Sequence, residues 1–231
     1  MTKALLLFSG GQDSTTALAW CLHRFNEVYL IAFDYGQNHL IELSAAKKIV
    51  KKINNNFSEW NGKIKNILVY KINKFNEFNK NSLTSDIGIR TDGRLPNTFV
   101  PGRNILFYTL ASSYAYDKNI NHIVSGVCQT DYSGYPDCRN ETIKSLEKSI
   151  NLGMEMQYKF HTPLMWKDKA DIWKMAQHLG GQKYLNLVKK NTHTCYKGNR
   201  KDYHDWGYGC NNCPACALRS NGWEKFINAV K

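Results

Sequence analysis

Apolar segments alternate with amphipathic segments along most of the chain, and this order restricts the fold more than any other feature. Runs typical of buried strands occupy residues 3–8, 28–34, 67–72 and 122–127. Segments with helical spacing of apolar residues occupy 14–24, 41–53, 104–116, 141–152 and 169–179. A β–α–β order places helices over a parallel sheet. The sequence therefore predicts an α/β fold of Rossmann-like type, with an open, mostly parallel sheet and helices on both faces.

The character of the sequence changes after Thr192. Cysteine, glycine and aromatic residues replace the strand–helix rhythm from that point. We therefore expect an α/β domain over residues 1–192 and a small C-terminal metal-binding and helical segment over residues 193–231. The polar stretch from Asn73 to Asn97 has little periodicity, and we interpret it as a long loop and a candidate lid.

Composition narrows the class of protein. The 231 residues carry a net charge of +12, largely from lysines scattered among asparagines. We interpret this excess as a solvated basic surface that favours anionic partners. No apolar run approaches the roughly 20 residues that cross a bilayer. The apolar start ends in Gly10 and Gly11 without a signal-peptide cleavage pattern, so we expect a cytoplasmic protein with no membrane partner.

The loop SGGQDS follows the first strand and leads directly into the first helix. In open α/β sheets, ligands bind beyond the carboxyl ends of the strands. Gly10 and Gly11 allow a sharp turn and a close approach to a ligand, and the N–H groups of a helix start attract anions. Asp13 suits such a site if Mg²⁺ accompanies the phosphates. The alternative is an ordinary turn, because Ser and Asp are common helix caps.

Two other phosphate loops are absent from the sequence, the Walker A pattern and the G-x-G-x-x-G dinucleotide pattern. The loop SGGQDS instead resembles the pyrophosphate loop of the N-type ATP pyrophosphatases, whose fold is of the adenine nucleotide alpha hydrolase type. The resemblance implies that ATP is split between its α- and β-phosphates while a substrate oxygen attacks the α-phosphorus. It implies ATP-binding residues at Phe8, Ser9, Gly10, Gly11, Gln12, Asp13, Ser14, Thr15, Thr16, Ala17 and Leu18.

Two further strings lie near predicted strand ends or helix starts. FDYGQNH closes the second strand, so Tyr35, Gln37 and His39 are candidates to line a cleft, with Glu42 following. A simple turn at Gly36 is the alternative. FVPGRNILF places Arg103 at the start of a helix, where a cation opposes the helix dipole. A phosphate ligand would explain it, and a solvated loop arginine is the alternative.

DYSGYPDCR follows the strand at 122–127 and combines carboxylates, phenol rings and a guanidinium. One carboxylate can accept both N–H groups of a guanine-like edge, which Asp131 or Asp137 could provide. Tyr132 or Tyr135 can stack on the base, and Arg139 can pair with a substrate carboxylate. A chance Tyr/Gly/Pro loop is the alternative.

These strings, with TPLMWKDKADIW at 162–173, resemble the QueC family of 7-cyano-7-deazaguanine synthases over most of the chain. The resemblance implies a homodimeric C–N ligase of queuosine precursor biosynthesis. Such an enzyme converts 7-carboxy-7-deazaguanine and ammonia to 7-cyano-7-deazaguanine (preQ0) through an adenylated carboxylate and an adenylated amide. Asp13 and Arg103 are then expected to be catalytic. Substrate-binding residues are expected at Tyr35, Gln37, Asp131, Tyr132, Tyr135, Asp137, Arg139 and Lys169.

Other functions stay open at this point. A tRNA-modifying adenylase could use the same loop, and a related enzyme could act in DNA modification or antiphage defence. A non-catalytic nucleotide-binding zinc module would leave the string at 131–139 without a role. No extra RNA-binding domain or convincing catalytic cysteine pair is evident, so nucleic acid is not expected as a partner. Adenylation needs no protein nucleophile, and we interpret Cys128 and Cys138 as structural.

CNNCPAC near the C-terminus supplies Cys210, Cys213 and Cys216 at C-x₂-C-x₂-C spacing, and Cys195 precedes them. Such a thiolate set is typical of tetrahedral Zn²⁺, whereas an iron–sulfur cluster is the minor alternative. The QueC resemblance also implies a structural zinc bound by four cysteines. The long spacing after Cys195 leaves His193 or His204 as possible replacements for it.

Overall fold

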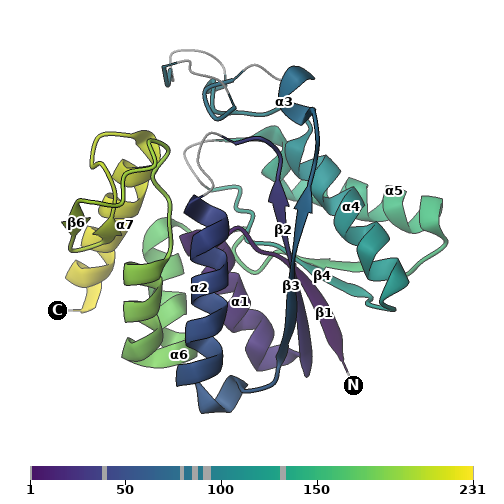
Figure 1. Cartoon of the computed structure of the whole chain (residues 1–231), viewed down its shortest axis with the longest axis horizontal. Coiled ribbons are helices and arrows are strands. Elements are labelled where there is room, and N and C mark those ends of the chain that lie inside the picture. Colours follow the sequence, from purple (N-terminus) through teal and green to yellow (C-terminus); the bar gives the residue numbers. More distant parts are fainter. Residues whose placement is uncertain are drawn as a thin grey trace.

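A parallel sheet of five strands, in the order β3-β2-β1-β4-β5, forms the centre of the computed structural model (Figure 1). The structure describes residues 2–37, 41–78, 81–84, 88–90, 95–130 and 134–230. The strands are β1 Lys3–Leu7, β2 Glu27–Asp34, β3 Ile64–Lys71, β4 His122–Val124 and β5 Lys159–His161. The predicted open parallel sheet is confirmed, and β5 is a strand that the sequence pattern did not indicate.

Helices cover both faces of the sheet, as expected (Figure 1). On one face lie α1 Gln12–Arg24, α2 Ile41–Asn56 and α6 Lys169–Asn191, and on the other lie α4 Arg103–Asp117 and α5 Asn140–Met154. Side chains alternate across a strand, so Leu6 of β1 packs with the first group of helices and Leu5 with the second. This alternation produces two separate apolar cores.

The strand order reverses between β1 and β4. The chain passes from β1 to β2 and β3 on one side and returns to add β4 and β5 on the other. Ligands of open α/β sheets bind at such a switch point, outside the carboxyl ends of the strands. Gly126, just after β4, lies so close to α1 that a Cβ there would be 2.9 Å from the amide nitrogen of Ser14. The fold therefore brings the β4 end directly against the SGGQDS loop.

Several elements differ from the sequence expectation. The helix expected at 169–179 continues to Asn191, with non-helical geometry at Gly180 and Gly181. The strand expected at 122–127 ends at Val124. The stretch 73–97 contains the short helix α3 Phe75–Phe78, and within it the Ser82 amide donates to the Asn97 carbonyl at 3.1 Å. Whether this stretch closes over a ligand stays a prediction. Single 3₁₀ turns lie at η1 Ser58–Trp60 and η2 Pro136–Cys138.

The segment after Thr192 forms a hairpin and a helix that pack against α6. The hairpin strands are β6 Tyr203–His204 and β7 Gly207–Tyr208, and the helix is α7 Pro214–Val230. Trp223 of α7 meets Trp173 of α6 edge to face, with ring centroids 5.0 Å apart. A third, small apolar cluster surrounds the cysteines of this segment. Among the described helices, none has the length and apolar character that a membrane span requires.

Candidate active site

A cavity of about 340 Å³ lies at the carboxyl ends of β1, β2 and β4, a volume suited to a small-molecule ligand. Its walls come from the loop after β1, the loop after β2, the start of α4 and the loop after β4. Eight residues expected at the site line it: Phe8, Ser9, Asp13, Ser14, Tyr35, Gln37, Arg103 and Tyr135. The structure thus brings together parts of four of the sequence strings.

The SGGQDS loop is braced by its own hydroxyl groups. The Gly11 amide donates to Ser9 Oγ and the Gly10 amide donates to Ser14 Oγ, each at 3.2 Å. The two hydroxyl oxygens are 3.1 Å apart. Gly11 occupies the N-cap of α1, and no described side chain caps that helix start. The positive end of α1 is therefore available to an anion at the cavity wall.

Gly10 is required by both conformation and space. Its φ is +84°, and a Cβ would lie 2.7 Å from the Glu42 carbonyl oxygen and the Ala46 amide nitrogen of α2. Gly11 is different, because its φ is −76°. Only Gly10 therefore needs the left-handed conformation that glycine tolerates.

The later residues of the expected ATP-binding set do not reach the cavity. Thr15 and Thr16 are buried, and the Thr16 hydroxyl donates to the Gln12 carbonyl at 3.0 Å. Ala17 and Leu18 are fully buried in the core between α1 and the sheet. Gly10, Gly11 and buried Gln12 are also absent from the described cavity wall, which takes only Phe8, Ser9, Asp13 and Ser14 from the expected ATP-binding set.

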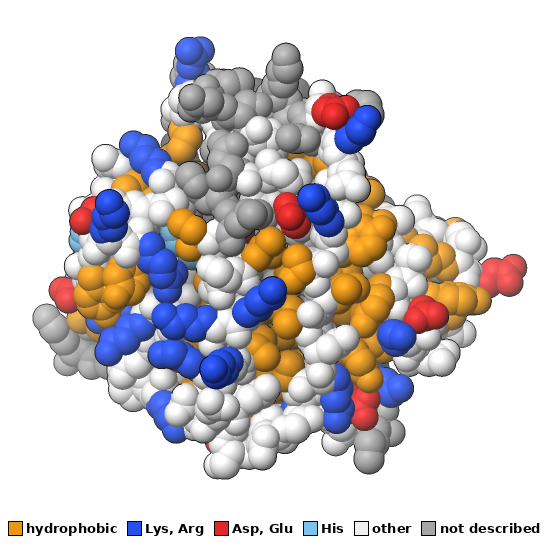
Figure 2. All heavy atoms as spheres, in the orientation of Figure 1, with side chains coloured by type: hydrophobic (Ala, Val, Ile, Leu, Met, Phe, Trp, Pro, Cys, Tyr) orange, Lys and Arg blue, Asp and Glu red, His pale blue; other side chains and the backbone are white. Residues whose placement is uncertain are grey.

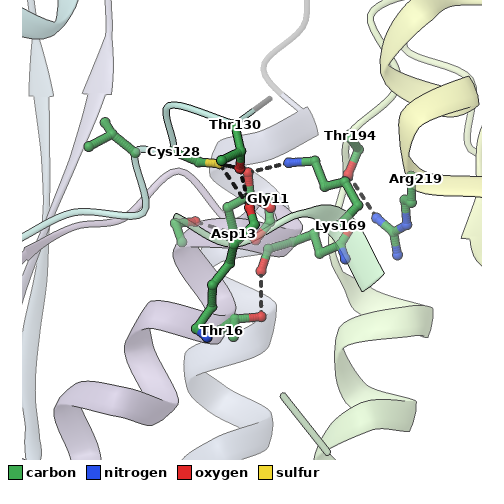
Figure 3. Close-up of polar contacts among 12 residues, drawn as sticks. Gly11, Asp13, Thr16, Cys128, Thr130, Lys169, Thr194 and Arg219 are labelled. Carbon is green, nitrogen blue, oxygen red and sulfur yellow. Dashed lines mark hydrogen bonds and ion pairs between the residues drawn. The ribbon is translucent and has the colours of Figure 1, made fainter. Parts of the chain in front are cut away.

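Asp13 and Lys169 form a short ion pair, with Nζ 2.6 Å from Oδ2 (Figure 3). Lys169 is the first residue of α6, and a capping box between Asp168 and Asp171 fixes this helix start. The sequence predicted that Lys169 binds substrate, and this stays a prediction. The structure places its ammonium on the Asp13 carboxylate of the SGGQDS loop.

The Lys169→Met variant is expected to lower kcat/KM for ATP by about 100-fold, because it removes a preorganised cation beside the loop. Steady-state pyrophosphate release measures the effect. Lys174→Met, at an exposed position on the same helix, is the matched control and should keep wild-type kinetics. Equal kinetics in both variants would contradict a role for Lys169 at the site.

Arg103 is held at the cavity wall by two neighbouring groups. Its Nη1 donates to the Tyr35 hydroxyl at 3.4 Å, and the guanidinium carbon lies 5.8 Å from the centre of the Tyr35 ring. The next residue, Asn104, donates its amide to Asp137 Oδ2 at 3.0 Å. Asp137 is 4 % exposed and caps α4. It is absent from the described cavity wall, and its contact with a base stays a prediction.

The other expected substrate residues differ in their placement. Tyr135 lines the cavity, and its hydroxyl shares a 2.6 Å hydrogen bond with the Thr98 hydroxyl. Gln37 also lines it, while its Oε1 accepts from the Tyr35 amide at 2.9 Å and closes the turn at Gly36. Arg139 is exposed at the start of α5 and away from the described cavity wall. Asp131, Tyr132 and His39 lie outside the described residues.

Titratable residues of the cavity wall that sequence reasoning did not assign to the site include Glu42, His193 and Tyr196. Burial raises the pKa of the Glu42 carboxyl to about 7, against the opposing effect of Arg103. Burial also lowers the pKa of His193 to about 4. The position of Glu42 after FDYGQNH could have indicated its role. His193 reaches the site only through tertiary packing.

The four cysteines Cys195, Cys210, Cys213 and Cys216 form a group that can hold a metal ion, with all sulfur atoms within 4.8 Å of one another. Hydrogen bonds from the Cys213 and Cys216 thiols lower the pKa of Cys195, which favours its thiolate. The His193 and His204 rings bond instead to the carbonyls of Cys195 and Gly209. The geometry therefore favours Cys195 as the fourth ligand.

Arg219 ties the cysteine segment to the rest of the molecule. Its side chain is fully buried, and Nη1 donates to the hydroxyls of Thr192 and Thr194, each at 2.8 Å (Figure 3). Between these threonines, the His193 amide donates to the Gly10 carbonyl at 3.2 Å. The segment that carries the four cysteines thus contacts the SGGQDS loop directly.

The family model described as Queuosine biosynthesis protein QueC matches residues 3–227 of this chain. The chain belongs to the QueC family. Among QueC relatives, a protein of Alkalilimnicola ehrlichii named 7-cyano-7-deazaguanine synthase is 48% identical over 96% of this chain and 94% of its own length. A protein of Herminiimonas arsenicoxydans with the same name is 51% identical over 97% of both chains.

Among solved structures, a 4-thiouridine synthetase in complex with RNA and bound ATP is similar to this QueC-family chain. The TM-score is 0.50 and the identity 18%, over 98% of this chain and 53% of that one. At this identity the likeness supports the fold alone. It agrees with the expected adenine nucleotide alpha hydrolase-like sheet.

Proposed function

We infer that this chain has the activity for which its QueC relatives are named, the synthesis of 7-cyano-7-deazaguanine for queuosine. The observation that carries this proposal is the cavity itself. It joins the uncapped start of α1 to Arg103 and Tyr35 at the switch point of the sheet. An anion-binding loop facing a fixed arginine suits ATP next to a small acidic substrate.

The reaction turns a carboxylate, which is a poor electrophile, into a nitrile in two rounds. An oxygen of 7-carboxy-7-deazaguanine attacks the α-phosphorus of ATP, and pyrophosphate departs from the loop. Ammonia then displaces AMP to give an amide. In the second round the amide oxygen is adenylated, and loss of AMP and the remaining N–H proton leaves the nitrile. Arg103 and the start of α1 stabilise the charge that develops on the phosphates in both rounds.

Two metals complete the proposal. Mg²⁺ accompanies ATP and requires few protein ligands, because phosphate oxygens and water supply the rest; Asp13 is the carboxylate placed to contact it. The cysteine group suits Zn²⁺, since sulfur atoms such as those of Cys210 and Cys216, 3.9 Å apart, fit a tetrahedral thiolate shell. With four cysteine ligands the zinc has no open position, and its role is structural. Residues 1–192 then form the ATP-binding domain and residues 193–231 the zinc module.

A homodimer in the cytoplasm is the proposed working form. Hydrophobic side chains gather on the face over β3 and α4 (Figure 2), and Tyr70, Ile105 and Tyr116 there are each more than two-fifths exposed. Such a patch beside an uncovered edge strand is typical of an association surface. The oligomeric state in solution, measured by light scattering, tests this part separately.

The activity is tested by incubating the purified protein with ATP, ammonium and 7-carboxy-7-deazaguanine. Mass spectrometry should detect the nitrile, and its formation should need no RNA. ATP consumption only in the presence of tRNA would favour a tRNA-modifying adenylase instead. Binding of ATP without turnover of any substrate would favour a non-catalytic module.

A further inference from the structure

Glu42 occupies a position in the cavity that neither the sequence strings nor the proposed reaction explains. It lies in the first turn of α2, and its carbonyl oxygen lies 2.7 Å from the place that a Cβ on Gly10 would take. Its side chain lines the same cavity as Ser9, Tyr35 and Arg103. Its carboxyl group therefore lines the cavity in which the proposed reaction would occur.

The carboxylate of Glu42 differs from that of Asp13, the other carboxylate on the described cavity wall. Asp13 is paired with Lys169. The ion pairs within the described part of the chain are Lys65–Glu27, Lys118–Asp117 and Lys169–Asp13, so Glu42 forms none of them. A cavity carboxylate without an ion pair can attract a small cation from solution.

The proposed reaction uses such a cation. At neutral pH the nitrogen source is almost entirely ammonium, which has no lone pair for attack on an acyl adenylate. A residue that binds ammonium and accepts one proton would supply ammonia at the reacting carbon. An acceptor of this kind works best when its pKa lies near the working pH. Burial moves the pKa of Glu42 into that range.

We propose that Glu42 is the catalytic residue that captures ammonium and accepts its proton, a role that rests on the proposed function. An N–H bond of ammonium breaks and an O–H bond forms on Glu42. The nitrogen lone pair then forms the C–N bond, and the C–O bond to AMP breaks with its electrons on the phosphate oxygen. The added nitrogen loses a second N–H proton to water, which leaves the neutral amide. The proton on Glu42 leaves to water through the open side of the cavity. The same carboxylate can accept the later N–H protons during nitrile formation.

The electrostatic surroundings of Glu42 are compatible with this role. The titratable and charged groups that line the cavity with it are Asp13, Tyr35, Arg103, Cys128, Tyr135, Cys138, His193, Cys195 and Tyr196. Burial has the largest effect on the pKa of Glu42, and the positive charge of Arg103 opposes it. Tyr35 contacts Arg103 and also lies within electrostatic range of Glu42. These groups keep the carboxyl able to exchange a proton near neutral pH.

The test compares Glu42→Gln with wild type in two partial reactions. Exchange of labelled pyrophosphate into ATP, with 7-carboxy-7-deazaguanine and no ammonium, reports adenylation alone and should change less than threefold. The value of kcat/KM for ammonium at about pH 7.5 should fall by about 100-fold. The defect should shrink as the pH rises to about 9, because free ammonia becomes abundant. Hydroxylamine, which is largely neutral at these pH values, should form the hydroxamate equally well with both proteins.

Two further variants complete the design. Glu42→Asp keeps the carboxylate and should recover part of the ammonium dependence, and Glu59→Gln, at an exposed position, should behave as wild type. An unchanged kcat/KM for ammonium in Glu42→Gln would overturn the proposal, as would equal losses of exchange and hydroxamate formation. A wild-type protein that makes no nitrile would instead contradict the proposed function itself. That result is distinguishable from both outcomes for Glu42→Gln.

Discussion

The Gly10→Ala variant is expected to lower ATP affinity by at least about 100-fold and to remove detectable synthesis of the nitrile. An alanine at this position must adopt a φ of +84°, and its methyl group would lie 2.7 Å from backbone atoms of α2. The left-handed conformation costs about 1–2 kcal/mol, and overpacking against backbone adds about 1–3 kcal/mol. The loop can relieve this only by moving away from α2, which displaces Ser9, Asp13 and Ser14 of the cavity wall. Equilibrium binding of ATP and denaturant unfolding measure the two effects.

Gly62→Ala separates backbone strain from displacement of the loop. Gly62 also has a positive φ, +73°, but a Cβ there would meet no atom within 4 Å. This variant should lose about 1 kcal/mol of stability and keep full ATP affinity. If Gly10→Ala bound ATP as tightly as Gly62→Ala, the assignment of the loop as the phosphate site would be wrong.

Removal of the metal is expected to unfold the C-terminal segment and to weaken ATP binding by about tenfold or more. Structural zinc contributes roughly 10–16 kcal/mol to the folding of small zinc-binding peptides. Here it would also hold Cys195, which directly follows Thr194. Buried Arg219 bonds to Thr192 and Thr194, and the His193 amide between them bonds to Gly10. Loss of the cysteine group should therefore loosen the nucleotide loop.

Cys213→Ala and Cys21→Ala are the matched pair for this prediction. Both cysteines are buried, but only Cys213 belongs to the metal-binding group. Cys213→Ala should lose bound metal, measured by elemental mass spectrometry, and several kcal/mol of stability. Cys21→Ala should keep the metal and lose about 1 kcal/mol. ATP affinity that stays at the wild-type value in metal-free Cys213→Ala would refute the link through His193.

Local patterns predicted the elements whose signals lie within one segment. The apolar run of β1, the glycines of the loop and the periodicity of α1 follow one another directly, so the strand–loop–helix unit was predictable. Strand β5 was not, because Lys159–His161 is a short segment with a single apolar residue. Its pairing with β4 depends on contacts across 37 residues, such as His122 with Lys159.

The sequence motifs that form the site were predictable, but the contacts of their individual residues were less so. Ser9, Asp13, Tyr35 and Arg103 meet in one cavity, as the strand ends suggested. The hydrogen bond from the Asn104 amide to Asp137 joins residues 33 positions apart, so the sequence does not reveal it. The ion pair of Lys169 with Asp13 spans 156 residues and leaves no local signal. Such pairings are decided by packing, which a single sequence does not display.

Transfer of AMP to the substrate carboxylate is the central claim, and oxygen labelling tests it most directly. With both carboxylate oxygens of 7-carboxy-7-deazaguanine replaced by oxygen-18, each round should pass one labelled oxygen to AMP. Every AMP released with the nitrile should then carry a single label, and pyrophosphate should carry none. Label in orthophosphate or pyrophosphate, or AMP without label, would contradict attack of the substrate oxygen on the α-phosphorus.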